Sequence, residues 1–375
     1  MRDSKILIKV IGVGGCGCNT VSSIEEKYAG SLGPNFEFYG VDTDFISLDN
    51  QKISHKLKIG TSGIGTAKDP QKGAEAAQRS LQEIKEMLQD SDIVILCAGL
   101  SGGTGSGATG VIAQAASGIE GCQVVMASVT LPFYYDDAKK QDAAQQALRN
   151  IKEVVPVVLP VQNGAGVEDE NVPFLEVLRA TDRNVISLLE MINIITSTNG
   201  TENLDFSEFV NVASTSGNAM IGIGEATGEQ AVSVAISLAR SPRNINVRDL
   251  SLKQASKLAL MTIGNAGITY KQMKDARSTL QNEIGRQTEV FSGLYVDKEM
   301  EGVKVILFAT GMAEESENTA YAGVTEETLA GPMKQFDMDF LSEDEGRFKG
   351  TAPAFIEGVN YDKPTFRRKN IRLEQ

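Results

Sequence analysis

The stretch Ser101-Gly102-Gly103-Thr104-Gly105-Ser106-Gly107 lies between an apolar run, 93–98, and a helix-like run that begins at Ala108. Four glycines in seven positions cannot build a core, but they permit positive φ angles and let backbone N–H groups come close to a ligand. Thr104 and Ser106 add hydroxyl donors, and the positive end of the following helix would point toward the same place. We therefore predict that this stretch cradles the phosphates of a nucleotide.

A second glycine loop, Gly12-Val13-Gly14-Gly15-Cys16-Gly17, follows an expected strand at 5–11 and precedes a helix expected from about Cys18. Taken alone, the loop and Asp42, at the end of the next strand, match the pattern of an NAD-binding unit. A dinucleotide site uses one such turn, so the second loop argues against NAD. A P-loop is excluded because the chain contains no G-x-x-x-x-G-K-[ST]. An NAD-dependent oxidoreductase remains the rival prediction, although the only histidine, His55, lies away from both loops.

The composition is that of an acidic protein with enough apolar residues for two cores. The chain has 375 residues, of which 41% are hydrophobic, and a formal net charge of −13. This charge argues against a nucleic-acid partner, and no apolar run reaches the length of a membrane span. The four cysteines indicate a reducing, cytoplasmic setting, and we interpret Cys16 and Cys18 as small packing residues rather than metal ligands.

Short apolar runs alternate with helical patterns in the first half, which predicts an α/β, Rossmann-like domain with a parallel sheet. A long amphipathic helix is expected at 174–196, followed by a smaller α+β unit. An acidic segment follows, which we interpret as a flexible linker, with a loosely packed helical tail as the alternative; a short terminal peptide comes after it. The expected boundaries are 1–173 for the nucleotide-binding domain, 174–198 for the connecting helix, 199–312 for the second unit, 313–358 for the linker and 359–375 for the peptide.

Two acidic residues stand at the start of an expected helix at 206–213. The three-residue spacing of Asp205 and Glu208 places both carboxylates on one face of that helix. Carboxylates and a cation are sufficient for nucleoside triphosphate hydrolysis, which depends on positioning and charge stabilisation more than on a strong base. The alternative is simple N-capping of the helix by Asp205.

The motifs together resemble the FtsZ family of division proteins, relatives of tubulin. The two glycine loops resemble the family's GVGGGGxN and GGGTGTG loops, and the resemblance extends over most of the chain. Further similar segments are Val41-Asp42-Thr43-Asp44, 63–73, Thr130-Leu131-Pro132-Phe133, 203–208 and 219–224. The resemblance implies a tubulin-like fold and a GTP-hydrolysing protein that forms head-to-tail filaments in bacterial or archaeal cell division, with GTP or GDP and Mg²⁺ as cofactors.

The resemblance also implies residue roles. In the family, the loop of one subunit enters the nucleotide pocket of the next, so Asp205 and Glu208 would orient the attacking water and Asn203 would support the loop. Glu208 replaces the usual family aspartate, so the rate of hydrolysis stays open. The departures at Ser101, Val161 and Lys140 leave a further possibility, a regulatory paralogue that binds GTP and copolymerises but hydrolyses poorly. The nucleotide-binding residues implied are Gly14, Gly15, Cys16, Asn19, Asp42, Ser101, Gly102, Gly103, Thr104, Gly105, Ser106, Gly107, Asp136, Lys140 and Asp182.

Guanine presents N–H donors, so a carboxylate is the expected reader of the base. Asp182 matches the family's helix aspartate by position, Asn19 could contact base or ribose, and Asp136 and Lys140 stand where the family has Glu and Arg. Two departures are Ser101 in the signature loop and Pro160-Val161-Gln162-Asn163 in place of a Pro-Asn-Asp loop. Asn163 could take the role of the usual base-contacting asparagine after a register shift, and which residue does so stays open.

The terminal segment Tyr361–Lys369 combines a proline, an aromatic residue and a basic cluster. It resembles the DxPxFxR peptide by which FtsZ proteins dock to membrane-anchor partners. The resemblance implies a cytoplasmic protein at the division site without direct membrane insertion, and an ordinary solvated tail is the alternative.

Overall fold

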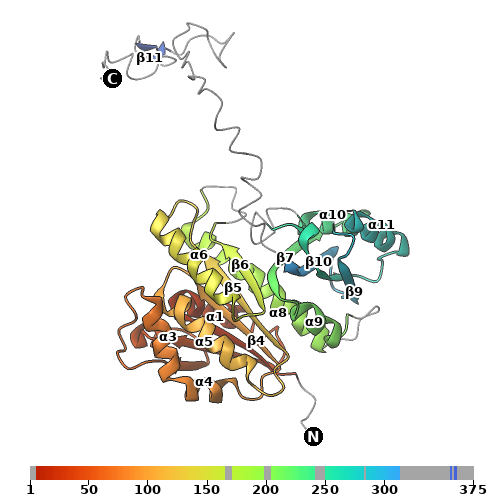
Figure 1. Cartoon of the computed structure of the whole chain (residues 1–375). Helices are drawn as coiled ribbons and strands as arrows, with labels where there is room; N and C mark the ends of the chain where they lie inside the picture. The colour runs from red at the N-terminus through yellow and green to blue at the C-terminus, as the bar shows by residue number, and fades with distance from the viewer. Residues whose placement is uncertain are drawn as a thin grey trace, which may run out of the picture. The chain divides into compact units, whose positions relative to one another are not determined.

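The computed structural model describes residues 6–164, 171–197, 204–240, 250–282 and 284–312, and the backbone of 355–356 and 359–360. It divides into two units, Met1–Glu314 and Glu315–Gln375, and Figure 1 labels the helices and strands of the first. In the second unit, β11 (Phe355–Ile356) pairs antiparallel with β12 (Val359–Asn360). Nearly all of the expected linker and all of the segment Tyr361–Lys369 lie outside the described residues.

The first unit is built on one ten-stranded sheet with the order β3-β2-β1-β4-β5-β6-β7-β10-β8-β9. Its strands are β1 (Ile8–Val13), β2 (Phe36–Asp42), β3 (His55–Lys58), β4 (Ile93–Gly99), β5 (Val124–Leu131), β6 (Val157–Gln162), β7 (Gly217–Ala226), β8 (Lys257–Gly264), β9 (Glu289–Val296) and β10 (Val303–Met312). The first six are parallel, β7 joins β6 in parallel, and β10 runs antiparallel to β7 and β8. The two expected units therefore share a continuous sheet.

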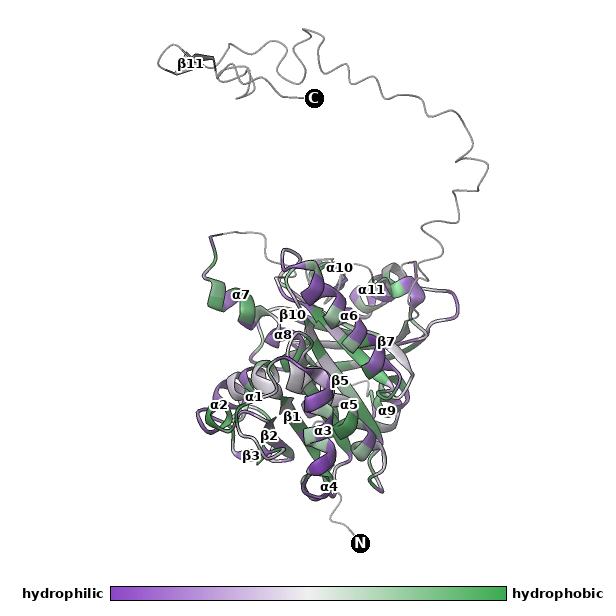
Figure 2. Cartoon of the chain, turned by 60° about the vertical axis from the view of Figure 1, so that its left-hand side comes forward, coloured by the Kyte–Doolittle hydropathy of each residue, from purple (hydrophilic) through white to green (hydrophobic). Residues whose placement is uncertain are grey.

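Helices cover both faces of this sheet. They are α1 (Gly14–Tyr28), α2 (Phe45–Asp49), α3 (Pro70–Arg79), α4 (Leu81–Leu88), α5 (Gly103–Ser117), α6 (Ala138–Lys152), α7 (Phe174–Ala180), α8 (Asp182–Ser197), α9 (Phe206–Ala213), α10 (Ala231–Ala239) and α11 (Tyr270–Gln281), with a 3-10 turn at Leu252–Gln254. Figure 2 shows apolar strands inside and polar residues on the outer helix faces. This layering agrees with the predicted α/β class.

Strand β4 shows why the sheet is buried on both sides. Ile93, Ile95 and Cys97 pack into the core that includes α1 and α8, whereas Val94, Leu96 and Ala98 pack into the core under α3 to α6. All seven residues of β4 are buried, as expected for a central parallel strand. The end of β4 is therefore a rigid platform for the glycine loop that follows it.

Three sequence-based boundaries were wrong. Helix α1 begins at Gly14 rather than near Cys18, and α5 begins at Gly103 rather than Ala108. The helix expected at 174–196 is interrupted at Thr181, whose hydroxyl donates to the Leu178 carbonyl oxygen at 2.8 Å. The two parts differ because α7 buries none of its residues, whereas α8 buries seven.

The expected strands were confirmed, with shifts of a few residues at their ends. Strand β3 was missed because its sequence, His55-Lys56-Leu57-Lys58, lacks an apolar run. It lies at the edge of the sheet beside β2, where exposed lysines are common.

Candidate nucleotide site

The two glycine loops meet at the carboxyl ends of adjacent strands. Strands β1 and β4 pair in parallel, with Val13 opposite Ala98, and helices α1 and α5 start directly beyond them. Neither helix has a side-chain hydrogen bond at its N-cap, Val13 or Gly102. The N–H groups of both first turns are thus left to bind a ligand, and both helix dipoles favour a negative charge there.

The glycines do not all serve the purpose that the sequence suggested. Of the residues in the two loops, only Gly14 has a positive φ, at 70°. A Cβ on Gly103 would lie 2.1 Å from the Thr66 Oγ1 atom, and one on Gly105 would lie 2.6 Å from the Gly99 oxygen. These two glycines permit close packing of α5 rather than an unusual backbone conformation.

Two other glycines face open space. A Cβ added to Gly15 or Gly102 would meet no atom within 4 Å. In contrast, a Cβ on Gly14 would lie 2.8 Å from the Gly105 nitrogen, so the two loops are in contact with each other. Gly15 and Gly102 therefore border the space in which phosphates would lie between the two helix starts. We call the first turns of α1 and α5 the cradle.

Thr104 is held in the cradle by a polar network. Its Oγ1 atom lies 2.7 Å from the Thr43 Oγ1 atom. The Asp42 carboxylate accepts the Thr43 N–H at 2.7 Å and the Asp44 N–H at 3.3 Å, and it is only 4% exposed. Burial raises the pKa of Asp42, while these backbone N–H groups and the Thr104 hydroxyl lower it. Asp42 thus orders its own loop and Thr104, which differs from the exposed ribose acceptor of an NAD site.

Asp182 is the first residue of α8 and lies close to α1. It is 5% exposed, and burial raises its pKa to about 6. The hydroxyls of Thr20 and Ser23 and the charges of Lys27 and Arg179 act in the opposite direction. A carboxylate with these neighbours is available to accept hydrogen bonds from a ligand beside α1.

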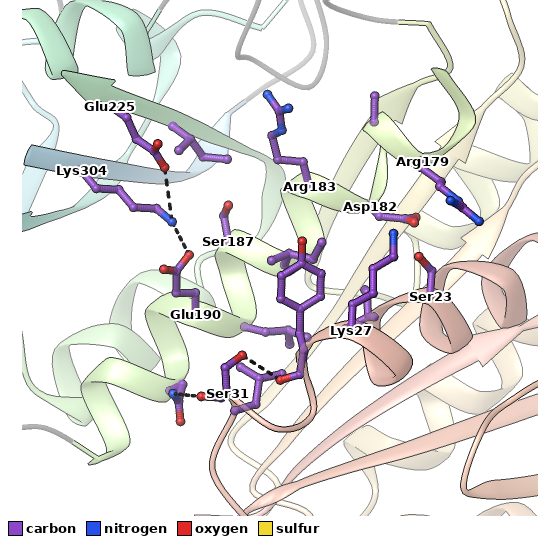
Figure 3. Close-up of a pocket in the computed structure, with 18 of the residues that line it drawn as sticks. Ser23, Lys27, Ser31, Arg179, Asp182, Arg183, Ser187, Glu190, Glu225 and Lys304 are labelled. Atoms are coloured by element: carbon purple, nitrogen blue, oxygen red, sulfur yellow. Dashed lines mark hydrogen bonds and ion pairs between the residues drawn. The ribbon is translucent and has the colours of Figure 1, made fainter. Parts of the chain in front are cut away.

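Asp182 lines a cavity of about 1000 Å³ between α1, α7, α8 and the second half of the sheet. Figure 3 shows Lys27 and Ser23 pointing toward Asp182 at one end of this cavity, with the Arg179 side chain beside them. At the other end, the Lys304 ammonium contacts Glu190 at 2.6 Å and Glu225 at 3.7 Å. The charges at that end are therefore already paired, whereas those around Asp182 face the open cavity.

The remaining predicted ligand contacts lie near the cradle or on its flanks. Asn19 is exposed and accepts a hydrogen bond from Gln51 Nε2 at 2.9 Å. The Asp136 carboxylate pairs with Lys140 at 2.8 Å and accepts the Phe133 N–H at 2.9 Å, and the Lys140 hydrogen bond lowers its pKa. The Asp136 and Lys140 side chains thus form an ion pair at the start of α6.

The other predicted cradle residues differ in exposure. Ser101 is exposed, and Ser106 and Thr104 are buried in the first turns of α5. Cys16 is an exposed residue, but its sulfur lies close to the end of β4, where a Cβ added to Gly99 would come within 2.8 Å of it. Burial raises the pKa of the Cys16 thiol, with Asp182 adding to this effect. Gly107 is packed against the Pro70 oxygen, on the side of α3.

The acidic pair lies in a different part of the molecule. Asp205 caps α9 by accepting the Glu208 N–H at 2.7 Å, and the Glu208 carboxylate accepts the Asp205 N–H at 3.1 Å. Hydrogen bonds from Glu208 N–H and the Ser207 hydroxyl lower the pKa of Asp205. The capping alternative is therefore realised in the structure. Asn203 lies outside the described residues.

Three polar residues beside Asp182 were not predicted from the sequence: Ser23, Lys27 and Arg179. Ser23 and Lys27 could have been found from the sequence, because Asn19, Ser23 and Lys27 are spaced four residues apart and share one face of α1. The third, Arg179, lies three residues before Asp182, which is the spacing at which side chains meet on one helix face, although the helix is interrupted at Thr181 between them.

Two glycine-lined helix starts beside a parallel sheet, followed by a central helix and a second half built on the same sheet, define a nucleotide-binding protein of the tubulin-like class. A family model described as the GTPase domain of the Tubulin/FtsZ family matches residues 7–168. A cell division protein FtsZ 1 from Archaeoglobus fulgidus is 30% identical over 319 residues, which cover 83% of this chain and 84% of that protein. FtsZ 1 from Pyrococcus horikoshii is 31% identical over 331 residues, or 87% and 85% of the two chains.

Solved structures of FtsZ and CetZ proteins have the same fold as this chain. An empty FtsZ dimer from M. jannaschii superimposes with a TM-score of 0.71 at 29% identity, over 83% of this chain and 89% of that one. CetZ2 from Haloferax volcanii, in a GTPγS-bound protofilament, has a TM-score of 0.72 over 86% and 98% of the two chains, and at 21% identity it supports the fold alone. The chain belongs to the tubulin/FtsZ family and carries its GTPase domain. None of the helices in the described part combines the length and apolar character that a membrane crossing requires.

Proposed function

We propose that this protein binds GTP in its cradle and hydrolyses it to GDP and phosphate when copies join head to tail into filaments, as in cell division. One relationship supports this proposal above all others. The cradle lies next to Asp182 at the start of α8, whereas Asp205 and Glu208 follow the far end of that helix. The 16 residues of α8 span about 24 Å. The acidic pair would therefore act on the nucleotide of a neighbouring copy.

Strand direction supports the same arrangement. Helix α9 leads into β7, whose Gly217 pairs with Val157, the first residue of β6. Because β1, β4, β5 and β6 are parallel, Val157 lies at the amino-terminal ends of these strands, whereas the cradle lies at their carboxyl ends. When two copies stack along the strand direction, the amino-terminal ends of the strands in one copy face the carboxyl ends in the other. The FtsZ from M. jannaschii that this chain resembles at 29% identity was solved as a dimer.

In the proposed complex, the phosphates contact the N–H groups at the starts of α1 and α5, and the guanine N1–H and N2–H₂ groups donate to Asp182. Asp136 and Lys140 border the ribose. Among the described residues, no group of three or more His, Cys, Asp or Glu side chains could hold a metal ion alone. Mg²⁺ would thus be held chiefly by phosphate oxygens, whose charge it would neutralise when bound.

The acidic pair would position the attacking water. Hydrogen bonds lower the pKa of Asp205 further below neutral pH. Its carboxylate is therefore charged at pH 7 and can accept a hydrogen bond from water. Asp205 and Glu208 would act together, with Asn203 supporting the loop. Phosphoryl transfer needs this kind of positioning more than a strong base.

The test is to measure phosphate release and light scattering in parallel with GTP, GDP, ATP and NAD. We expect release and filaments with GTP alone, and turnover per molecule that rises above a threshold protein concentration. Turnover that is independent of concentration would show that one chain holds a complete site, and activity with ATP equal to that with GTP would remove the guanine assignment.

The capping box favours a second candidate function, a regulatory paralogue that copolymerises but hydrolyses slowly. Both carboxylates of the acidic pair are engaged in capping α9. If this engagement persists in the filament, GTP binding and assembly would be normal while turnover stays low at every protein concentration. Single-turnover measurements on assembled filaments distinguish the two candidates.

We also propose that the terminal segment Tyr361–Lys369 docks to a membrane-anchor partner and so places the protein at the division site. Deletion of 361–375 is expected to leave GTP turnover and filament formation unchanged and to abolish recruitment to vesicles that carry the anchor. Recruitment that survives the deletion would remove this role.

A further inference from the structure

We infer that Arg179 reads the O6 and N7 edge of guanine while Asp182 reads the N1 and N2 edge. This inference rests on the proposed GTP binding and adds a specificity residue to it. It also names a residue that could take the role of the family's base-contacting asparagine, because the segment at 160–163 reads Pro-Val-Gln-Asn where the family has Pro-Asn-Asp.

The position of the cavity supports this assignment. Asp182 borders both the cavity and the α1 face that bears Thr20 and Ser23. Thr20 lies six residues after Gly14, or about 9 Å along α1, a separation that a ribose and its first phosphate can bridge. A base whose phosphates lie in the cradle would therefore enter the end of the cavity drawn in Figure 3.

The chemistry of guanine fixes the order of its neighbours. Around the ring, the N2 and N1 donors are followed directly by the O6 and N7 acceptors. A carboxylate that takes the donors therefore places the acceptors beside it, where a cation is needed. Figure 3 shows two cations beside Asp182, Lys27 from α1 and Arg179 from α7.

Arg179 is the better match of the two cations. Its planar fork can donate to O6 and N7 together, whereas a lysine ammonium supplies a point charge to one of them. The Arg179 side chain is exposed and forms no ion pair within the described part of the chain. Its guanidinium is thus available to a ligand, and its removal should leave the fold intact.

Adenine would be rejected at both edges. It carries N6–H₂ where guanine has O6, so its amino group would face Arg179, a donor. It lacks the N1–H and N2–H₂ groups that Asp182 accepts. Arg179 and Asp182 therefore discriminate between the two purines by complementary mechanisms.

The test uses GDP, 7-deaza-GDP, which has C–H in place of N7, and IDP, which lacks the N2 amine. GDP is used because it avoids hydrolysis. For the parent protein we expect both analogues to bind more weakly than GDP by a factor of about 5 to 150 each. In Arg179→Ala, 7-deaza-GDP and GDP should bind equally, while the preference over IDP remains. In Asp182→Asn, the preference over IDP should be lost and that over 7-deaza-GDP retained.

Arg183→Ala is the matched control, because Arg183 lines the same cavity with the same charge but lies away from Asp182 in Figure 3. It should keep both preferences, and Arg179→Lys should recover only part of the N7 preference. Circular dichroism melting checks that each variant folds. An N7 preference that survives in Arg179→Ala, or that is lost in Lys27→Ala instead, would overturn the inference while GDP binding still stands. Equal binding of GDP and ADP by the parent would overturn the proposed function itself.

Discussion

Asp205 and Glu208 hydrogen-bond each other's backbone: the Asp205 carboxylate accepts the Glu208 N–H at 2.7 Å, and the Glu208 carboxylate accepts the Asp205 N–H at 3.1 Å. A glutamate at the third position of the helix can reach back in this way. Glu208, which stands where the family usually has aspartate, therefore also stabilises α9. One pair of side chains has a structural role in the free chain and a proposed catalytic role in the filament.

These two roles can be separated by amide substitutions. Asparagine caps a helix about as well as aspartate, and glutamine can close a capping box. Asp205→Asn and Glu208→Gln are therefore expected to change the free energy of unfolding by less than about 0.5 kcal/mol. Phosphate release should fall by a factor of about 10² to 10⁴ in Asp205→Asn, because the water-orienting carboxylate is lost.

Alanine provides the comparison. Asp205→Ala should lose the same activity and in addition about 1 kcal/mol of stability, because the N-cap is removed. Urea unfolding followed by circular dichroism measures the second effect. An Asp205→Asn variant with normal turnover would show that the residue acts as a cap alone.

The glycines of the cradle should fall into two groups. Gly15→Val and Gly102→Val place a side chain in open space at an ordinary φ, so we expect normal folding and loss of GTP binding. Gly105→Ala instead drives a Cβ to 2.6 Å from the Gly99 oxygen and should destabilise the protein by about 1–3 kcal/mol or more. Thermal melting and nucleotide titration on the three variants separate the groups. Tight GTP binding by Gly102→Val would place the phosphates elsewhere.

Nucleotide binding should depend on the ionisation of Asp182. Because burial raises its pKa to about 6, the carboxylate is mostly charged at pH 7 and loses its charge as the pH falls below 6. The dissociation constant of GDP should rise about tenfold per pH unit below that point. Asp182→Asn should bind weakly and without this pH dependence. A flat pH profile in the parent protein would remove Asp182 as the base acceptor.

Ionisation of Asp182 is expected to favour nucleotide binding but to lower the free energy of unfolding. A carboxyl group whose folded pKa is raised from 3.8 to about 6 binds more protons in the folded state, so its contribution to stability is greatest below pH 3.8 and is lost as the pH rises to 6. Above that pH the charged Asp182 costs about 3 kcal/mol. Asp182→Asn is therefore expected to raise the unfolding free energy at pH 7 and to change it little at pH 4. Urea unfolding at both pH values measures the difference.

The sequence predicted those features that depend on local patterns. Apolar runs such as Ile93–Ala98 are readable as buried strands, and the glycine loops follow them directly. The helix starts at Gly14 and Gly103 could not be predicted, because glycine lowers helix propensity. Only the packing of these residues against neighbouring backbone explains why glycine stands at both positions. A propensity argument cannot detect such tertiary contacts.

The candidate site divides in the same way. The cradle and Asp182 could be located by motif and by position along the chain. The role of Asp42 could not, because it depends on a contact with Thr104 from a distant segment. The contribution of Ser23 and Lys27 to the surroundings of Asp182 could not either, because α1 and α8 are brought together only by packing. Convergence of side chains from distant segments is decided by packing, which the order of residues does not display.

The location of the acidic pair leads to a prediction about mixtures. Gly102→Val should fail to bind GTP but retain Asp205 and Glu208, whereas Asp205→Asn should bind GTP but lack the water-orienting carboxylate. Neither variant alone should release phosphate at an appreciable rate. In a filament containing both, the acidic pair of a Gly102→Val subunit meets the GTP held by an Asp205→Asn neighbour. Mixing them should thus restore part of the parent activity, with a maximum at intermediate ratios.

The control is a mixture of Asp205→Asn with a Gly102→Val, Asp205→Asn double variant, in which no subunit offers an intact pair. It should remain inactive at every ratio, although its subunits match the first mixture in every other respect. Phosphate release is measured above the assembly threshold, with sedimentation to confirm that both variants enter the filament. If both variants sediment together and the first mixture is as inactive as the control, the acidic pair does not act across the contact between copies.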